Sequence, residues 1–140
     1  MSVPLPHRVF SIDETRWPVV VVRIPPDSPD EVVFEMVRRM GEVPARGRCA
    51  FVYDIPSFVL PNAYQRRAVV DGLNDSRRRH PGRVAANAIV TSSSAMMEGM
   101  VRAITWLRPP TEPTRMFRSI DDAVAWAETQ LALGEQRASL

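Results

Sequence analysis

The stretch RCAFVYDIP, residues 48–56, decides the fold. Most side chains from Cys49 to Ile55 are apolar types that suit burial on both faces, which is typical of a central strand in a parallel sheet. Pro56 then ends the strand. A carboxylate at the carboxyl end of such a strand, here Asp54, lies where open α/β sheets bind ligands. The stretch therefore predicts a fold class and a place on that fold, without naming a ligand.

Strands and helices alternate on both sides of this stretch. A strand over Trp17–Ile24 is indicated by four consecutive valines. The next segment, 28–31, reads SPDE and predicts a helix with Ser28 in a capping box, ended by Gly41. Further strands are predicted at residues 87–90 and 115–118, and further helices at 61–80, 96–107 and from 119 onward.

The predicted fold class is α/β, with the element order ββαβαβαβα. We expect a mostly parallel sheet of about five strands, an antiparallel first hairpin and four helices. The whole chain, residues 1–140, is expected to be one domain. Residues 1–7 are expected to form a loose N-terminal arm, and residues 135–140 a frayed tail.

Composition narrows the chemistry. All 18 basic residues are arginines, so no Schiff-base lysine or P-loop lysine exists. The single cysteine, Cys49, excludes an internal disulfide and, with no apolar leader at the N-terminus, predicts a cytoplasmic protein. The longest apolar run, Pro18 to Val22, is far shorter than the ~20 residues of a transmembrane helix. No Cys/His spacing predicts a metal site, and no cofactor is expected.

The positive charge is concentrated in residues 66–83. This segment holds six arginines against two aspartates, while the whole chain carries only +2. Such a local patch, with few aromatic residues, argues against nucleic-acid binding. Residues 77–79, three consecutive arginines at the end of the second helix, read first as a solvated face that complements the helix dipole. An acidic partner surface or anionic lipid head groups are the alternatives.

Five short motifs carry a resemblance to a known family. They are Trp17-Pro18-Val19-Val20-Val21, Tyr53-Asp54, Arg66-Arg67, Ala88-Ile89-Val90-Thr91-Ser92, and Phe117-Arg118-Ser119 leading to Ala123 and Trp126. In this order the chain resembles the STAS fold of anti-sigma-factor antagonists. It is more closely similar to small bacterial STAS-like domains that are related in fold to lipid-binding CRAL-TRIO domains. The resemblance implies a non-enzymatic regulatory domain that binds a partner protein, with lipid or small-molecule binding as the alternative.

The chain departs from the antagonist pattern at one point. Antagonists carry a phosphorylatable serine at the start of the helix that follows the central strand. Here the only hydroxyl between Ile55 and Ala63 is Ser57, which lies earlier, in the loop. A phosphoryl switch of the antagonist type is therefore in doubt.

Candidate binding residues gather around the carboxyl ends of two predicted strands. Asp54 can order its loop or bind a ligand, and the arginine forks of Arg66 and Arg67 suit an anion or a structural pair with Asp54. Hydroxyl side chains follow the later strand, where they can cap a helix or contact an anion. The complete set of partner- or ligand-binding candidates is Asp54, Ser57, Tyr64, Arg66, Arg67, Thr91, Ser92 and Ser93, with Tyr64 expected to face inward.

The sequence offers no catalytic constellation. No histidine or glutamate stands near Asp54 in the chain, and no nucleophile elbow surrounds Ser92. We therefore expect no enzyme, and a small enzyme using Asp54 is the least favoured hypothesis. The methionine-rich third helix reads as core, with a partner or lipid surface as its alternative. A homodimer through an edge strand or this helix stays open.

Overall fold

The computed structural model describes residues 10–23, 28–55, 62–91, 99 and 112–138. Its sheet has five strands in the order β1-β2-β3-β4-β5, of which β1 pairs antiparallel with β2 and the rest are parallel. The predicted α/β class, mostly parallel sheet and antiparallel first hairpin are thus confirmed. The strands are β1 (Ser11–Asp13), β2 (Val19–Arg23), β3 (Cys49–Ile55), β4 (Val84–Thr91) and β5 (Thr114–Phe117).

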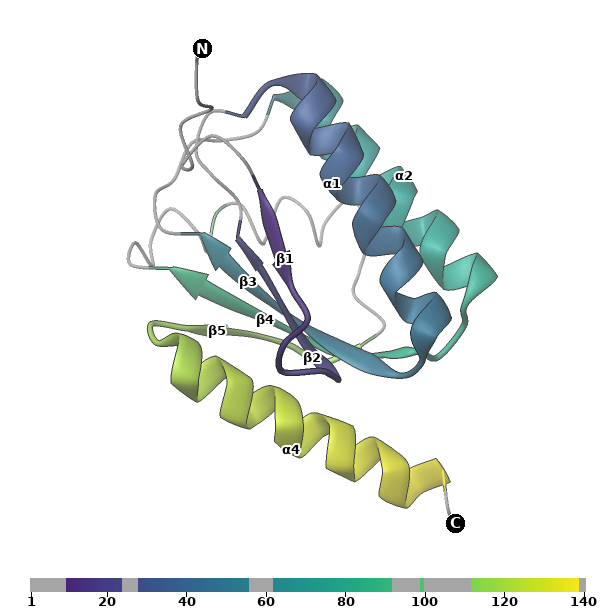
Figure 1. Cartoon of the computed structure of the whole chain (residues 1–140), viewed down its shortest axis with the longest axis vertical. Coiled ribbons are helices and arrows are strands. Elements are labelled where there is room, and N and C mark those ends of the chain that lie inside the picture. The colour runs from purple at the N-terminus through teal and green to yellow at the C-terminus, as the bar shows by residue number, and fades with distance from the viewer. Residues whose placement is uncertain (1–9, 24–27, 56–61, 92–98, 100–111, 139–140) are drawn as a thin grey trace.

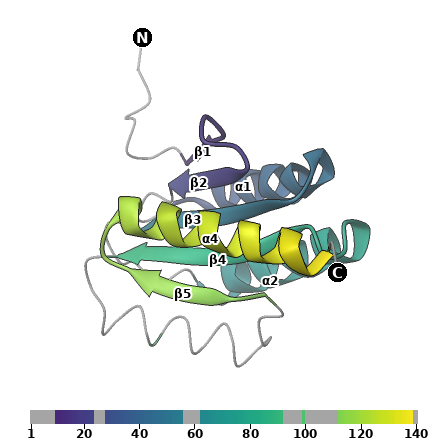
Figure 2. The ribbon, with the colours of Figure 1, turned by 90° about the horizontal axis from the view of Figure 1, so that it is seen from below.

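Three α-helices lie within the described residues, on both faces of the sheet. Figure 1 shows α1 and α2 side by side on one face and α4 on the other, and Figure 2 shows the same layers from below. The fourth expected helix, with Met96 and Met100, falls outside the described residues except for the single helical residue Gly99. Residues 1–7 also fall outside them. The helices are α1 (Asp30–Glu42), α2 (Ala63–Arg79) and α4 (Ile120–Ala138), and a short 3-10 helix, η2 (Val43–Arg46), follows α1. The last helix continues beyond the expected end at Gly134.

The sheet separates two apolar cores because successive strand residues point to opposite faces. One core lies under α4 and contains valines and alanines of β2, β3 and β4, together with Ala123, Val124, Ala127 and Leu131 of the helix. The other lies under α1 and contains Val20, Val22, Cys49 and Phe51 of the strands, with Met36 and Met40 of α1. Val20, Val22, Cys49 and Val52 are completely buried or nearly so, which confirms central strands buried on both faces.

The ends of the first two α-helices differ from the predictions. Pro29 takes the N-cap position of α1, so the Ser28 capping box is wrong. Gly41 lies inside the last turn of α1 instead of ending it, and the chain then turns through η2 to Gly47. The capping box is found at α2, where Asn62 and Gln65 exchange side-chain bonds with each other's backbone N–H. An asparagine cap serves the same orphan donors as a serine.

α1 and α2 pack in parallel and in constant register. Gln65 bonds to Asp30, Ser76 bonds to the carbonyl of Gly41, and each pair is 35 residues apart. Between them, Gly72 lies so close to Val37 that a Cβ atom on Gly72 would overlap the Val37 Cγ1. Small residues at the contact let the two backbones approach, and they fix which residues stand at the same level on the two helices.

Candidate functional site at the carboxyl edge of the sheet

The carboxyl ends of the parallel strands meet at one edge, as predicted. Arg23 stands opposite Asp54 in the β2–β3 ladder, and Asp54 stands opposite Val90 in the β3–β4 ladder. The strand ends near residues 54 and 90 are therefore neighbours. This register is the geometric basis of the candidate site.

Asp54 is held by an arginine that the sequence analysis did not consider. The Nε of Arg23 lies 3.2 Å from Oδ2 of Asp54, and the side chains are 65% and 17% exposed, respectively. The interpretation of Asp54 as a residue that pairs with an arginine is thus supported, but the arginine comes from β2 instead of the Arg66-Arg67 pair. The pair joins two adjacent strand ends, and the more exposed Arg23 side chain leaves its guanidinium open to solvent at this edge.

The hydroxyl candidates divide between described and undescribed residues. Thr91 closes β4 opposite Ile55 and is only 5% exposed. Thr91 is therefore buried beneath the edge, and its side chain forms little of the exposed surface there. Ser57, Ser92 and Ser93 lie outside the described residues.

The start of α2 is tied firmly to the start of α1. The Nε2 of Gln65 donates to the carbonyl of Ser28 at 2.9 Å and to Oδ1 of Asp30 at 2.8 Å. The Nδ2 of Asn62 donates to the same Asp30 oxygen at 3.3 Å. Gln65 is 7% exposed, so its two bonds are partly shielded from water, whereas the Asn62 bond is exposed. Both helix ends are thereby fixed relative to each other beside the carboxyl edge.

Tyr64 was expected to face inward, and this is wrong: the residue is 68% exposed. Gln65 takes the buried position in the first turn of α2, and the neighbouring residue is rotated by about 100° around the helix axis. The ring of Tyr64 instead contacts Phe34 of α1 edge-on, with ring centroids 5.6 Å apart. Phe34 is itself 37% exposed, so the two rings form an aromatic pair on the outer surface.

The two arginines after Tyr64 have different surroundings. Arg67 is exposed and pairs with Asp71 one turn later, with Nε 3.4 Å from Oδ1. Arg66 is partly buried. The structure thus places Asp54 and Thr91 at neighbouring strand ends, with their side chains on opposite faces of the sheet. It places Tyr64 and Arg67 on the exposed face of α2.

A polar cluster on the α2 side of the sheet was missed by the sequence analysis. Arg77 forms an ion pair with Glu112, and the Nδ2 of Asn87 donates to the same carboxylate at 3.0 Å. The side chains of Arg77 and Glu112 are 21% and 10% exposed. Arg77 is therefore not part of a solvated face with Arg78 and Arg79. The one available sign was Asn87, a polar residue inside an otherwise apolar strand.

Tyr53 lies in the same region, and its electrostatics reflect the cluster. Burial raises the pKa of its phenol strongly, and the charges of Glu112 and Cys49 raise it further, while Arg77 acts in the opposite sense. The phenol is therefore neutral at physiological pH. Among the buried side-chain atoms of the described residues, Nη1 of Arg77 stands without a hydrogen-bond partner.

Within the described ranges, no group of three or more His, Cys, Asp or Glu side chains is placed to hold a metal ion. Among the helices that the structure describes, none combines the length and the apolar character that crossing a bilayer requires.

Comparison of the chain with protein-family models, with curated proteins and with solved structures finds no significant match. The STAS-like resemblance consequently remains a prediction.

Proposed function

We propose that this chain is a non-enzymatic regulatory or protein-interaction domain of STAS-like fold, which binds a partner protein at the carboxyl edge of its sheet. The contact surface in this proposal consists of Arg23, Asp54, Asn62 and Arg66. It works without the phosphorylatable serine of the antagonist family.

One observation supports the proposal most. Three adjacent parallel strands end in register at Arg23, Asp54 and Val90–Thr91. Open α/β sheets bind their ligands at such edges. The edge offers a half-exposed arginine–aspartate pair and a fixed helix start. These are groups for polar recognition, whereas chemistry would need a base, a nucleophile and an orienting group in mutual contact.

The experiment is affinity capture from the native host, followed by binding of the purified partner. The test variant is Asp54→Ala with Arg66→Ala, and the control is Glu128→Gln, an exposed residue halfway along α4 and away from the carboxyl edge. We expect at least tenfold weaker binding for the test variant and unchanged binding for the control. Equal binding of the purified partner by all three proteins would reject this surface.

A second candidate is binding of a small or lipid-like ligand that carries a hydrogen-bond acceptor. The buried, unpartnered Nη1 of Arg77 favours it, because a buried donor without a partner costs about 1–3 kcal/mol. Native mass spectrometry of the purified protein, with and without added fatty acids, tests this candidate. It predicts a bound mass that Arg77→Gln reduces; bare protein under both conditions would reject it.

A further inference from the structure

The outer face of α1 and α2 has a self-complementary charge pattern, in which acidic positions on one helix lie level with basic positions on the other. Residues of α1 and α2 that are 35 apart in the sequence lie at the same height along the two helices, which we call a level. Along α1 the exposed charges run Glu31, Glu35, Arg38, Arg39 and Glu42. Along α2, from the same end, they run Arg67, Asp71, Asp75, Arg78 and Arg79. At most levels, an acidic side chain on α1 therefore lies beside a basic side chain on α2, and a basic side chain on α1 lies beside an acidic one on α2.

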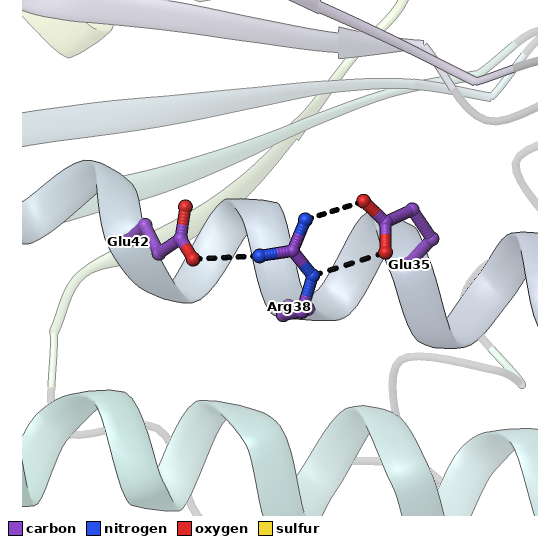
Figure 3. A network of polar contacts seen from close by, with 3 residues as sticks. All are labelled: Glu35, Arg38 and Glu42. Atoms are coloured by element: carbon purple, nitrogen blue, oxygen red, sulfur yellow. Dashed lines mark hydrogen bonds and ion pairs between the residues drawn. The ribbon is translucent and has the colours of Figure 1, made fainter.

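The ion pairs of this face run along each helix. Arg38 donates through Nε and Nη2 to Glu35 at 3.0 and 2.5 Å, and through Nη1 to Glu42 at 2.8 Å (Figure 3). On α2, Arg67 pairs with Asp71, and Arg79 pairs with Asp75. The charged side chains of α1 and α2 therefore pair within their own helix and not across to the other one. They remain exposed, so a second protein surface can reach them.

The aromatic pair lies at one end of the same face. Phe34 and Tyr64 are two of the three large apolar side chains that are exposed among the described residues, the third being Leu133 on α4. The bonds of Gln65 to Ser28 and Asp30 fix the two helix starts that carry these rings, and the rings contact each other edge-on. Rigid exposed aromatic residues are the usual anchors of protein interfaces.

We propose that this face binds a second copy of the chain, related by a two-fold axis that runs parallel to α1 and α2. Such an axis lays α1 of one copy along α2 of the other, in parallel and at equal levels. Glu31 then faces the second copy's Arg67, Arg38 faces its Asp71 and Asp75, and Glu42 faces its Arg78. The two aromatic pairs meet and form a cluster of four rings.

The other two-fold arrangement fits the pattern less well. An axis perpendicular to the helices pairs α1 with α1 in antiparallel fashion, which brings Glu31 opposite Glu42 and moves the aromatic pairs to opposite ends. In the parallel arrangement only Glu35 meets a like charge, Asp71. Arg38 already neutralises Glu35 and, through its hydrogen bond, lowers the pKa of that carboxyl.

The size of the face sets the expected strength. Helices of 13 and 17 residues are roughly 20 and 26 Å long. Packed side by side they offer about 400 Å² per copy, which is at the low end for protein interfaces. The dimer is therefore weak and reversible, and it forms at high protein concentration.

Sedimentation velocity across a concentration series reaching about 1 mM tests the proposal, because an interface of this size gives a weak complex. Wild type is expected to dimerise. Glu31→Arg alone and Arg67→Glu alone each place like charges opposite each other and are expected to weaken dimerisation at least tenfold. The double variant Glu31→Arg/Arg67→Glu restores opposite charges and is expected to recover dimerisation to within about threefold, as expected for complementary charges across an interface.

Controls separate this face from the rest of the molecule. Glu128→Arg reverses an exposed charge on α4 and is expected to leave dimerisation unchanged, as is Asp54→Ala at the carboxyl edge. Circular dichroism checks that each variant is folded. A monomeric wild type throughout the series, or a double variant as weak as the single ones, would overturn the proposal. Either outcome leaves partner binding at the carboxyl edge to be judged by its own experiment.

Discussion

The two faces of the sheet are built differently. Under α4 the buried core consists of valine, alanine and leucine, and all five of its alanines (Ala50, Ala86, Ala88, Ala123 and Ala127) are fully buried. Under α1 and α2 the core uses larger and more polarizable side chains, including Met36, Met40 and Phe51. That second face also carries the Arg77–Glu112–Asn87 cluster and the exposed aromatic pair. The buried polar cluster therefore lies on the α1–α2 side, whereas the Arg23–Asp54 pair lies on the α4 side at the carboxyl edge, in step with Val21 and Val52.

The difference follows from how each helix is seated. Alanines on α4 and on β3–β4 let the helix lie close to the sheet, so this contact is largely apolar, apart from Nη1 of Arg48, which donates to the carbonyl of Leu131 at 2.6 Å. On the other side, α1 and α2 contact each other through Gly41, Gly72 and Ser76. The contact beneath α4 is thus mainly structural, whereas the exposed outer side of α1 and α2 carries the charged and aromatic groups of the proposed dimer surface.

The largest effect that this comparison predicts concerns the polar cluster. Glu112→Ala leaves the guanidinium of Arg77, which is 21% exposed, without its ion-pair partner. Breaking a largely buried pair in this way is expected to lower the free energy of unfolding by about 3 kcal/mol. Urea denaturation measures this change.

Two matched variants complete this test. Asp75→Asn removes a partner from an exposed pair on the same helix, Arg79–Asp75, and is expected to cost less than about 1 kcal/mol. Replacing both Arg77 and Glu112 by leucine is expected to recover most of the loss, because no charge then remains buried. Equal losses from Glu112→Ala and Asp75→Asn would show that the cluster is effectively solvated.

The next effect belongs to the α4 face. Ala127 is fully buried against the sheet, and Ala127→Leu is expected to lower the free energy of unfolding by about 2 kcal/mol through overpacking. Ala125→Leu, an exposed position on the same helix, is the control and is expected to leave stability nearly unchanged. Thermal denaturation distinguishes the two, and an unaffected Ala127→Leu protein would mean that the α4 layer adapts to added volume.

The sheet was predictable because its signals are local. Consecutive apolar residues in 19–22 and 49–52 are buried whichever face they take, so the strand assignment holds without knowledge of the partners. Strand ends were less certain: β4 runs over Val84–Thr91, although only residues 87–90 were predicted. Its first half contains alanines, which have little strand preference of their own and are placed there by packing against α4.

The candidate site was predictable only in outline. The position of Asp54 at a strand end follows from the sequence, but its partner Arg23 depends on the register between β2 and β3, a non-local property. The exposure of Tyr64 depends on a phase of α2 that the bonds of Gln65 fix. Arg77 meets Glu112 across 35 residues of chain, and no local pattern announces such a contact.

A smaller effect is predicted at the contact between α1 and α2. A Cβ atom on Gly72 would overlap Cγ1 of Val37, so Gly72→Ala is expected to destabilise the protein by about 1 kcal/mol, after the ~1 kcal/mol that alanine gains over glycine in a helix. In a Val37→Ala background the overlap disappears, and the same substitution is expected to stabilise. Chemical denaturation of the four proteins in this double-mutant cycle measures the coupling. The same sign in both backgrounds would contradict the close approach.

The smallest effect concerns the reactivity of Cys49 under the α1 face. Burial raises the pKa of its thiol from 9.0 to about 11, and the side chain is completely buried. At pH 8 a thiol-specific reagent is therefore expected to modify Cys49 only when the α1 face opens, so the labelling rate measures that opening. At this pH the raised pKa itself does not change the folding stability. Because the unfolded thiol ionises at lower pH than the folded one, its contribution to stability is present below pH 9 and is lost as the pH rises toward 11.

Labelling kinetics with increasing urea measure this opening. A rate that rises with urea along the global unfolding curve would show that the α1 face opens only when the α4 face does. A rate that is slow but independent of urea would show that the α1 face opens locally while α4 stays in place. Fast labelling in the absence of urea would contradict the burial of Cys49. The thiol thus reports whether the two faces, which differ in composition, also differ in stability, because a locally opening face is the one from which movable binding elements are drawn.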